Sequence, residues 1–520
     1  MTECNNQKNN FVNKNYSKNR QGSAIAYGLI IMSVTAMILV SMLQYISAQL
    51  KFTGNRVERE KSFQIAESGI YFYRWYLAHE ISGKTAQQIK YFWKNGSPYG
   101  VAVPYEAEYS DPEGGPIGKY QIEVQAPDLN STIVIIKSTG WTYKSPGVKR
   151  IIQARFRRPS WSEYAVLADD NMRFGEGTQI YGKIHSNYGI RFDGVAHNII
   201  SSSLYSYDDP DHSGGLEFGV HTHISPTDPV NPVYPTPPPN RSDVFEAGRQ
   251  MPLPTISFNG VLSDLNFMKT EAQAGRGKYF NNLGYGRRII LKNNGTYDVC
   301  TVNSYDTISK SITNYAGVVS GATKNHGSAN GSACVTTACC ATSDCANLSG
   351  SGNGKCVSLA NYNIVTNGVI FVENNVWLEG TINNKKTTIV AANLIGGPQA
   401  DAYIGINSIL YTNFDGKDII GLIGQKDISV VRDSQSTLTI DAALLAQSGR
   451  VGRDYYSGSY NKNTITVNGS IATKLRYGFA YTDGTGYVNR ILNFDNNLLY
   501  YPPPYFPTGT EYYIDLWDEL

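Results

Sequence analysis

An uninterrupted apolar run near the N-terminus is the feature that most limits what this chain can fold into. From Ala24 to Leu43 the sequence reads AIAYGLIIMSVTAMILVSML, and no charged residue occurs between Arg20 and Lys51. At about 1.5 Å of rise per residue, a helix of this length spans the roughly 30 Å hydrocarbon core of a bilayer. The run is too long for the apolar part of a secretory signal. We therefore expect a single membrane-spanning helix.

A basic leader stands directly before this run. Lys14, Lys18 and Arg20 are followed by Gln21-Gly22. Positive charge of this kind favours the cytoplasmic side of a membrane. We therefore expect residues 1–22 to be a leader and the rest of the chain to lie beyond the cytoplasmic face.

The helical pattern continues past the membrane run, through NRVEREKSFQIAESGIYFYRWYLAHEIS. Apolar residues recur there at steps of three or four, which predicts one buried stripe on an amphipathic helix. The stripe consists of Phe63, Ala66, Ile70, Tyr73, Leu77 and Ile81, and a polar collar of Arg56, Glu58, Arg59, Glu60 and Lys61 precedes it. We expect residues 23–85 to form one transmembrane and amphipathic stalk helix.

A glycine-ended basic leader that abuts a membrane helix resembles the class III signal of type IV pilins and their relatives. The run KSFQIAESGIYFYRW also resembles the segment that follows the membrane helix in minor pilins of the tip class. The resemblance implies that prepilin peptidase cuts between Gly22 and Ser23. It also implies contact with other pilin-like subunits through the N-terminal helix, and with an inner-membrane assembly platform. The alternative is an ordinary single-pass anchor with a juxtamembrane helix.

Two positions depart from the usual pilin pattern. Most pilins begin the mature chain with Phe and carry Glu at its fifth position, whereas here these residues are Ser23 and Tyr27. In major pilins that glutamate is thought to meet the amine of a neighbouring subunit within the bilayer, where a buried charge needs a partner. The tip-capping pseudopilin of type II secretion also lacks it. Tyr27 therefore favours a tip position over a repeating one.

The composition fits an exported, β-rich protein. The chain has 50 Gly and 37 Tyr in 520 residues, and its net charge of +2 gives no reason to expect a nucleic-acid partner. Of the seven cysteines, Cys4 lies in the leader. The other six lie in one segment: Cys300, Cys334, Cys339, Cys340, Cys345 and Cys356. An even number outside the cytoplasm predicts disulfides of unknown pairing, with a zinc site as the weaker alternative.

Residues 86–159 show a period of two, which predicts a small antiparallel sheet. Three strands are expected, at 120–124, 132–136 and 150–156, with turns at 128–130 and 145–147. Such a sheet covering the stripe of the stalk helix would form a small pilin-like head.

A weak repeat begins at Tyr164. Short apolar strands alternate with polar turns, and an apolar-x-Gly-x-apolar step recurs around Gly182, Gly194, Gly380 and Gly469. Strands of this kind without intervening helices suit the rungs of a solenoid. The fold class expected is α+β/all-β, with a right-handed parallel β-helix after the pilin-like head; a β-sandwich with long loops is the alternative. Rungs are expected at 160–225 and 357–520.

The middle of the chain interrupts this repeat. Residues 226–299 are expected to hold a Pro-rich linker, strands and a short helix capped by Ser263 and ended by Gly275. Residues 300–356 are expected to be a disulfide-bearing insertion. An aromatic and proline-rich segment near the C-terminus, with Tyr500, Tyr501, Tyr505 and Phe506, is expected to cap an open end of the solenoid, or else to face a ligand.

An enzyme is the rival hypothesis, because some β-helix proteins cleave carbohydrate. Glycoside cleavage needs two carboxyl groups at a defined separation. The acids available for such a pair are Asp169, Asp170, Asp193, Asp418, Asp427 and Asp441, and His185 and His197 are the histidines considered with them. Most of these acids stand in expected turns, where a capping role is common. No GxSxG, HExxH or P-loop motif occurs in a fitting context. We expect no catalytic residue, no metal and no cofactor.

The sequence therefore predicts a non-enzymatic minor pilin or pseudopilin, at the tip of a type IV pilus-like fibre, that acts in fibre initiation and in adhesion or ligand contact. It would cross the inner membrane once before assembly, with its head outside the cytoplasm and later at the cell surface. A membrane-anchored β-helix protein that binds or cleaves carbohydrate is the alternative. The ligand of the head, a surface or a glycan, is left open.

Overall fold

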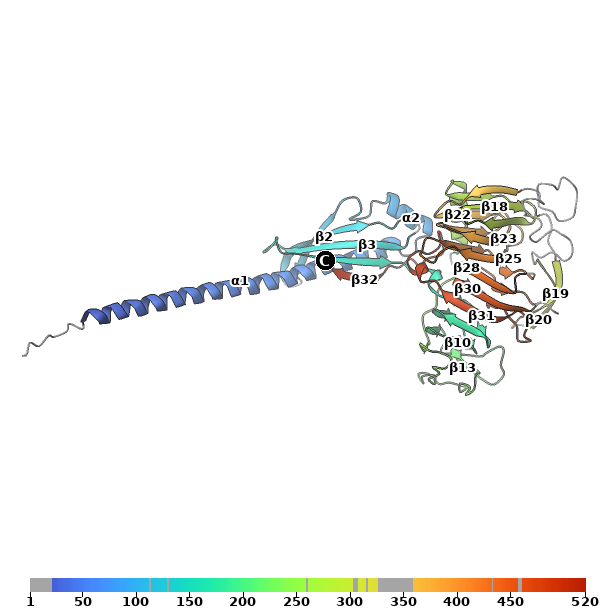
Figure 1. Ribbon diagram of the computed structural model, residues 1–520, viewed down its shortest axis with the longest axis horizontal. Helices are drawn as coiled ribbons and strands as arrows, with labels where there is room; N and C mark the ends of the chain where they lie inside the picture. The colour runs from blue at the N-terminus through green and yellow to red at the C-terminus, as the bar shows by residue number, and fades with distance from the viewer. Residues whose placement is uncertain are drawn as a thin grey trace, which may run out of the picture.

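The computed structural model describes residues 21–520 apart from 112–113, 129–130, 259–260, 303–306, 315–316, 326–358, 433 and 457–460. It consists of a long helix, a small sheet packed on the second half of that helix, and a large β-rich region beyond the sheet (Figure 1). The leader up to Arg20 lies outside the described residues, and so do all the cysteines expected to pair except Cys300. The disulfides therefore stay a prediction.

Helix α1 (Gln21–Ile81) changes its surroundings along its length. Its large apolar residues from Ile25 to Phe52 are exposed, whereas Ile65, Ala66 and the stripe residues from Ile70 to Ile81 are almost fully buried. Two glycines let the sheet approach this buried half. A Cβ at Gly69 would lie 2.3 Å from Ser138 Oγ, and one at Gly140 would lie 2.3 Å from the Ser62 carbonyl oxygen. The expected long helix is confirmed, although it ends at Ile81 and not at residue 85. The stripe is buried from Ala66 to Ile81, whereas its first member, Phe63, is only partly buried.

Helix α2 (Ala86–Asn95) lies where the sequence suggested the start of period-two strands. Thr85 accepts a hydrogen bond from the backbone of Gln88, and the Gln88 side chain accepts one from the backbone of Thr85. This reciprocal capping box starts a helix that buries Ile89 and Phe92. The expectation of strands from residue 86 onward is therefore wrong for these ten residues, because a local capping signal was overlooked.

The small sheet is antiparallel and has the order β1-β2-β3-β4-β32. Its strands are β1 (Tyr105–Asp111), β2 (Gly115–Gln125), β3 (Ile133–Thr142), β4 (Lys149–Arg157) and β32 (Tyr513–Glu519). Burial alternates strictly along β3, whose inner face packs on α1. The three strands expected from the sequence lie in β2, β3 and β4. The last strand of the chain completes the sheet, so residues between β4 and β32 form an insertion into it.

The insertion consists mainly of short strands. The first group is β5 (Val166–Ala168), β6 (Met172–Phe174), β7 (Thr178–Tyr181), β8 (Ile184–Ser186), β9 (Ile190–Phe192), β10 (Val195–Ala196), β11 (Ile200–Ser202), β12 (Ser206–Tyr207), β13 (Glu217–Phe218), β14 (Val220–His221) and β15 (Arg249–Gln250). The second group is β16 (Gly277–Phe280), β17 (Gly286–Leu291), β18 (Thr296–Thr301), β19 (Thr307–Asn314), β20 (Gly317–Asn325), β21 (Leu359–Asn363), β22 (Gly368–Val372), β23 (Asn375–Ile382), β24 (Lys386–Ala391), β25 (Ala402–Tyr411), β26 (Ile419–Gly424), β27 (Ile428–Val430), β28 (Thr437–Ala446), β29 (Val451–Arg453), β30 (Lys462–Thr473) and β31 (Tyr487–Phe494).

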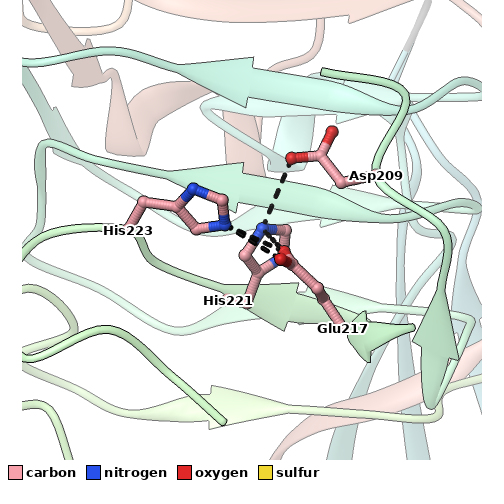
Figure 2. A group of neighbouring side chains, drawn as sticks. All are labelled: Asp209, Glu217, His221 and His223. Atoms are coloured by element: carbon pink, nitrogen blue, oxygen red, sulfur yellow. Dashed lines mark hydrogen bonds and ion pairs between the residues drawn. The ribbon is translucent and has the colours of Figure 1, made fainter. Parts of the chain in front are cut away.

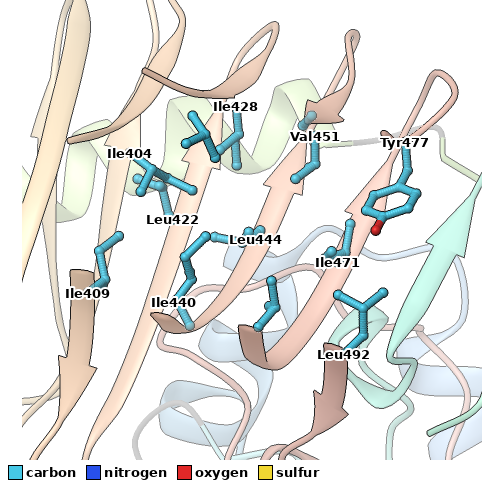
Figure 3. Packing of buried hydrophobic residues seen from close by; sticks show 14 of the residues in the cluster. Ile404, Ile409, Leu422, Ile428, Ile440, Leu444, Val451, Ile471, Tyr477 and Leu492 are labelled. Carbon is cyan, nitrogen blue, oxygen red and sulfur yellow. The ribbon is translucent and has the colours of Figure 1, made fainter. Parts of the chain in front are cut away.

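Most pairings in this region are parallel, and from β22 to β30 they join strands two apart in the chain, as in β22–β24–β26–β28–β30 and β23–β25–β27–β29. Paired positions stack buried aliphatic side chains on one another. One such row, the aliphatic ladder, runs through Ile370, Ile389, Leu422, Leu444, Ile471, Val166, Ile184 and Ile200. Figure 3 shows Leu422, Leu444 and Ile471 side by side in it. The ladder is one row of the larger buried core of the β-rich region.

The order of the strands in space differs from their order in the chain. β5 and β7, from the start of the insertion, pair with β30 and β31, from its end. β16 and β17 pair with β22 and β23 at the other side of the stack. The chain therefore crosses from one end of the stack to the other between β15 and β16.

The glycines of the repeated step lie where adjacent strands approach closely. A Cβ at Gly469 would lie 2.1 Å from the Ala442 carbonyl oxygen, and one at Gly380 would lie 2.2 Å from that of Leu291. Both glycines also have a positive φ. Glycine recurs at these positions because a side chain would clash with the backbone of the neighbouring strand.

Three segments differ from expectation. Helix α3 (Val261–Gln273) begins before Ser263, which therefore does not cap it. The Pro-rich segment is fastened to the β-rich region, since Tyr205 and Arg249 bond to its carbonyl groups, so it is not a free linker.

The C-terminal aromatic segment lies along a side of the stack: Phe506 packs beside Ile423, and Thr388 bonds to Pro504. It does not cap an end, because the chain must return to the small sheet as β32.

Candidate functional site

The exposed half of α1 is the first candidate site. It is one continuous apolar surface, and the helix that carries it is long and apolar enough to cross a membrane. Tyr27 lies on this surface with 66% of its area exposed. An exposed apolar surface of this size needs lipid or other protein to cover it.

The polar collar joins the two halves of α1, and one of its members is an anchor. Glu58 is buried; its Oε2 accepts a hydrogen bond of 2.7 Å from the Thr142 hydroxyl, and its Oε1 lies 3.2 Å from Lys144 Nζ. The bond from Thr142 lowers the pKa of Glu58; burial opposes this shift, and Lys144 adds to it. The carboxylate thus fastens the helix to the end of β3 at the point where the exposed half begins.

The residues singled out for processing lie at the start of α1. Gly22 and Ser23 belong to its first turn, and Tyr27 follows in the second. No geometry in the molecule tests cleavage between Gly22 and Ser23, which stays a prediction.

Most of the acids considered for carbohydrate cleavage act as backbone caps, whereas Asp169 pairs with the side chains of Asn187 and Lys474. Asp418 accepts bonds from the backbone of Thr412 and Asn413, and Asp441 accepts one from that of Tyr411. Asp427 accepts one from Arg450, and Asp170 one from Arg476. His185 pairs with Ser201, and His197 pairs with Glu246. These contacts are what Asx turns and strand ends require.

A second candidate site is a group of side chains that the sequence reasoning missed. We call Asp209, Glu217, His221 and His223 the His221 cluster (Figure 2). Glu217 lies on β13 and His221 on β14, and Asp209 follows β12, which pairs with β13. Gly219 allows the tight step between β13 and β14, because a Cβ there would lie 1.8 Å from the Leu204 carbonyl oxygen.

The ring of each histidine faces the Glu217 carboxylate. His223 Nε2 lies 3.0 and 3.1 Å from its two oxygens, and His221 Nε2 contacts Oε2 directly. His221 Nε2 also lies 3.5 Å from Asp209 Oδ2. Each cluster member except His223 is less than a tenth exposed. The cluster therefore places two imidazoles and two carboxylates in one largely buried space.

The charges in the cluster stabilise one another. Burial by itself would raise the pKa of Asp209 and of Glu217, but bonding to and attraction by His221 outweigh it and lower both to about 2. Burial likewise works against charge on His221, yet the two carboxylates raise its pKa. The space therefore favours positive charge between the two acids.

The signal for this cluster was present in the sequence. His221-Thr222-His223 is a pair two residues apart, which an extended backbone directs to one side, and Glu217 stands four residues before it. The six clustered cysteines gave a stronger metal-ligand pattern than this short histidine pair. Asp209 could be added only from the fold, since β12–β13 pairing brings it near.

Comparison with known proteins adds little to this description. No protein-family model matches the chain, and no curated protein sequence does either. Among solved structures, the crystal structure of the competence-associated pilin ComZ from Thermus thermophilus matches with 13% identity, over 89% of this chain and 98% of that one. The TM-score of this match is 0.27, which is too low to support an argument about fold or function. The functional conclusions therefore rest on the residues themselves.

Proposed function

We propose that this chain is a non-enzymatic, pilin-like subunit of a type IV pilus-like fibre. One observation carries the proposal: a single continuous helix leaves its first half as an exposed apolar surface and buries its second half under a small antiparallel sheet. A plain membrane anchor needs no such continuity, because its juxtamembrane helix can bend or end freely. A stalk that transfers from membrane to fibre needs one rigid rod whose apolar half can be covered by lipid or by neighbouring helices.

The β-rich insertion is proposed to be a β-solenoid, the right-handed parallel β-helix expected from the repeat. Parallel pairing between strands two apart, the aliphatic ladder and the glycine steps support it. In such a solenoid each rung buries its core against the next. The head would then present its outer faces and loops to a surface or glycan ligand.

The subunit is proposed to act at the fibre tip, in initiation and in adhesion. Tyr27 supports this position, because it supplies no carboxylate for the amine of a subunit above it. Its partners would be other pilin-like subunits through α1, prepilin peptidase and the inner-membrane assembly platform. Before assembly the chain would cross the inner membrane once, with its head outside the cytoplasm; afterwards it would stand at the cell surface.

A non-enzymatic role is supported by the hydrogen bonds that the candidate carboxylates accept. Most of the carboxylates considered for carbohydrate cleavage cap backbone groups of the stack, as the bonds to Asp418 and Asp441 illustrate, and Asp169 is paired with Asn187 and Lys474. A carbohydrate-cleaving pair would need one acid and one base free to reach a substrate. The head is therefore proposed to bind rather than to react.

Processing tests this proposal. Protein recovered from assembled fibres is expected to begin at Ser23, and Gly22→Val is expected to keep residues 1–22 and to be absent from fibres. Gly28→Val is the matched control, because a Cβ at Gly28 meets nothing within 4 Å; this variant should be processed normally. N-terminal sequencing of both the membrane and the fibre fractions measures this. An N-terminus at Met1 on protein within fibres would refute the pilin-like role and leave a plain anchor.

A further inference from the structure

The His221 cluster lies in a part of the head that the fibre role does not explain. Strands β12, β13 and β14 belong to the end of the β-rich region that lies away from β18, and they form small sheets outside the main stack (Figure 1). Their sheets have two or three strands, so they bury little apolar area of their own. A unit of this size benefits from a cross-link.

We propose that Asp209, Glu217, His221 and His223 bind one divalent transition-metal cation of the zinc class. Zinc takes imidazole nitrogen and carboxylate oxygen in four-coordinate sites, with bonds of about 2.0–2.2 Å. The four ligand atoms here lie within 4.8 Å of one another. A tetrahedral ion with such bonds separates its ligand atoms by about 3.4 Å, so side-chain shifts of about 1 Å would complete the shell.

Unsatisfied buried atoms point to a ligand in the same place. His221 is 1% exposed and Asp209 is 3% exposed. Neither ring nitrogen of His221, nor Oδ2 of Asp209, makes a hydrogen bond of good geometry with any described residue. His221 Nε2 is held only by its ion-pair contacts with Glu217 and Asp209, and Asp209 Oδ2 also lies 3.8 Å from Arg191 Nη1. Burying polar atoms without good hydrogen bonds destabilises the folded state. A cation between them would satisfy His221 Nε2 and the Asp209 oxygen at once.

A second set of residues holds the ligands in position. Asp193 Oδ1 accepts a bond of 2.8 Å from the backbone of His223, and its Oδ2 accepts one of 2.7 Å from Arg191. Arg191 in turn is paired in register with His221 across β9 and β14. His212 Nδ1 lies 2.8 Å from Glu217 Oε1. Support of this kind orients metal ligands in proteins.

The cluster also has an entrance. An open pocket of about 550 Å³ is lined by Asp208, Asp209 and His212, by Gly214 and Gly215 of the turn that follows, and by Asn231 of the Pro-rich segment. This pocket would be the route by which a cation reaches Asp209. With four protein ligands in place, the bound ion would have no open position for substrate, so its role would be to cross-link β12, β13 and β14.

The competing explanation is a closed network in which a proton, rather than a metal, lies between His221 and the acids. The two explanations differ in what happens when metal is supplied. The full chain, purified in detergent and stripped with a chelator, is titrated with Zn²⁺ and with Co²⁺. We expect one equivalent to bind, with a dissociation constant of about 1 μM or tighter, and hydrogen exchange of β12–β14 to slow on binding.

Two variants assign the site. His223→Gln should weaken binding at least about tenfold, since it removes a direct ligand. His197→Gln, at a partly buried histidine that pairs with Glu246 outside the cluster, should leave it unchanged. Co²⁺ bound here should show no thiolate charge-transfer band, which separates this site from the cysteine segment. Absence of binding at about 100 μM zinc, a thiolate spectrum, or equal affinity in His223→Gln would overturn the proposal.

Discussion

At the scale of single residues, Glu58 binds α1 to the small sheet at the junction between the exposed and buried halves of the helix. Its carboxylate is buried and takes a hydrogen bond from Thr142 and an ion pair from Lys144, so the residues that separate the two halves of the helix also bind it to the sheet. The sequence placed Glu58 correctly in a polar collar. It could not show that this one acid faces inward while Glu60, two positions later, is exposed, because charged residues on a helix give no sign of which way a neighbouring sheet will approach.

Glu58→Gln should loosen this junction. A bond to a charged group contributes about 1.5–3 kcal/mol, and the variant replaces it with a neutral one. Hydrogen exchange at the end of β3 should therefore accelerate in Glu58→Gln and stay unchanged in Glu60→Gln, the exposed control. Since the pKa of Glu58 is lowered in the folded state, its contribution is present at neutral pH and is lost as pH falls below 4.5. Equal exchange in both variants would contradict the assignment.

Asp264, in the first turn of α3, should show the opposite dependence on pH. Burial raises its pKa to about 6 from 3.8, with Arg158 opposing the shift. The folded state therefore holds a proton more tightly than the unfolded state, and its stability falls as pH rises from about 4 to 6.

Asp264→Asn should thus stabilise the head at pH 7.5 and make no difference at pH 3.5. The shift sets an upper bound of about 3 kcal/mol, and partial exposure of the carboxyl reduces the expected gain to about 1 kcal/mol. Thermal unfolding at the two pH values measures this, with the exposed Asp128→Asn as control. A gain of the same size at both pH values would show that the effect is not electrostatic.

At the scale of elements, the aliphatic ladder decides how the strands hold together. Leu444 is fully buried and stacks in register between Leu422 and Ile471. Leu444→Ala would leave a cavity between three strands, at a cost of about 2–5 kcal/mol. Leu475→Ala, at a residue 42% exposed, should cost less than about 0.5 kcal/mol.

Hydrogen exchange shows whether this damage is local. In Leu444→Ala, exchange should accelerate in β26, β28 and β30, because each strand depends on its neighbours in the stack. Exchange in β3 of the small sheet should not change. Acceleration restricted to β28 would mean that the ladder does not act as one core.

The sequence predicted which segments form helices and strands better than it predicted which of these elements pack or pair together. Period two located β2, β3 and β4, and the three- and four-residue steps located the stripe of α1, because both patterns arise from burial of one face. The sequence did not predict helix α2, although Thr85 and Gln88 form a capping box. The period-two pattern of the residues that follow favoured strands. β32 fell within the rungs expected at 357–520, because a single edge strand carries no sign of the sheet that it will join.

At the scale of the whole molecule, the head is fixed to the stalk by two adjacent segments. Trp161 donates a backbone bond to Pro507, Gly509 donates one to Pro159, and Ser160 pairs with Thr508. Entry and exit of the insertion therefore run side by side. Inside the head, β5 from the start of the insertion pairs with β30 from near its end. No local sequence signal predicts this pairing, because the two strands are about 300 residues apart.

If the chain has the proposed fibre role, this attachment limits where it can stand in the fibre. The β-rich region extends to both sides of the axis of α1, with β18 on one side and β13 on the other (Figure 1). In a fibre of closely stacked helices, a rigid head of this width would collide with the next subunit along the axis. Tyr27, in addition, provides no carboxylate to offset the amine of a subunit above. Both properties allow one copy at an end and oppose many along the length.

The subunit should therefore be substoichiometric in purified fibres, and its deletion should reduce fibre initiation or surface attachment. Quantitative mass spectrometry and gold labelling of the head measure number and position, and a label on the most abundant subunit of the same fibres is the positive control. Tyr27→Glu should not improve assembly, because no amine lies above it to be neutralised. Label at regular intervals along the shaft, or a gain of function in Tyr27→Glu, would refute the tip position while leaving the pilin-like stalk intact.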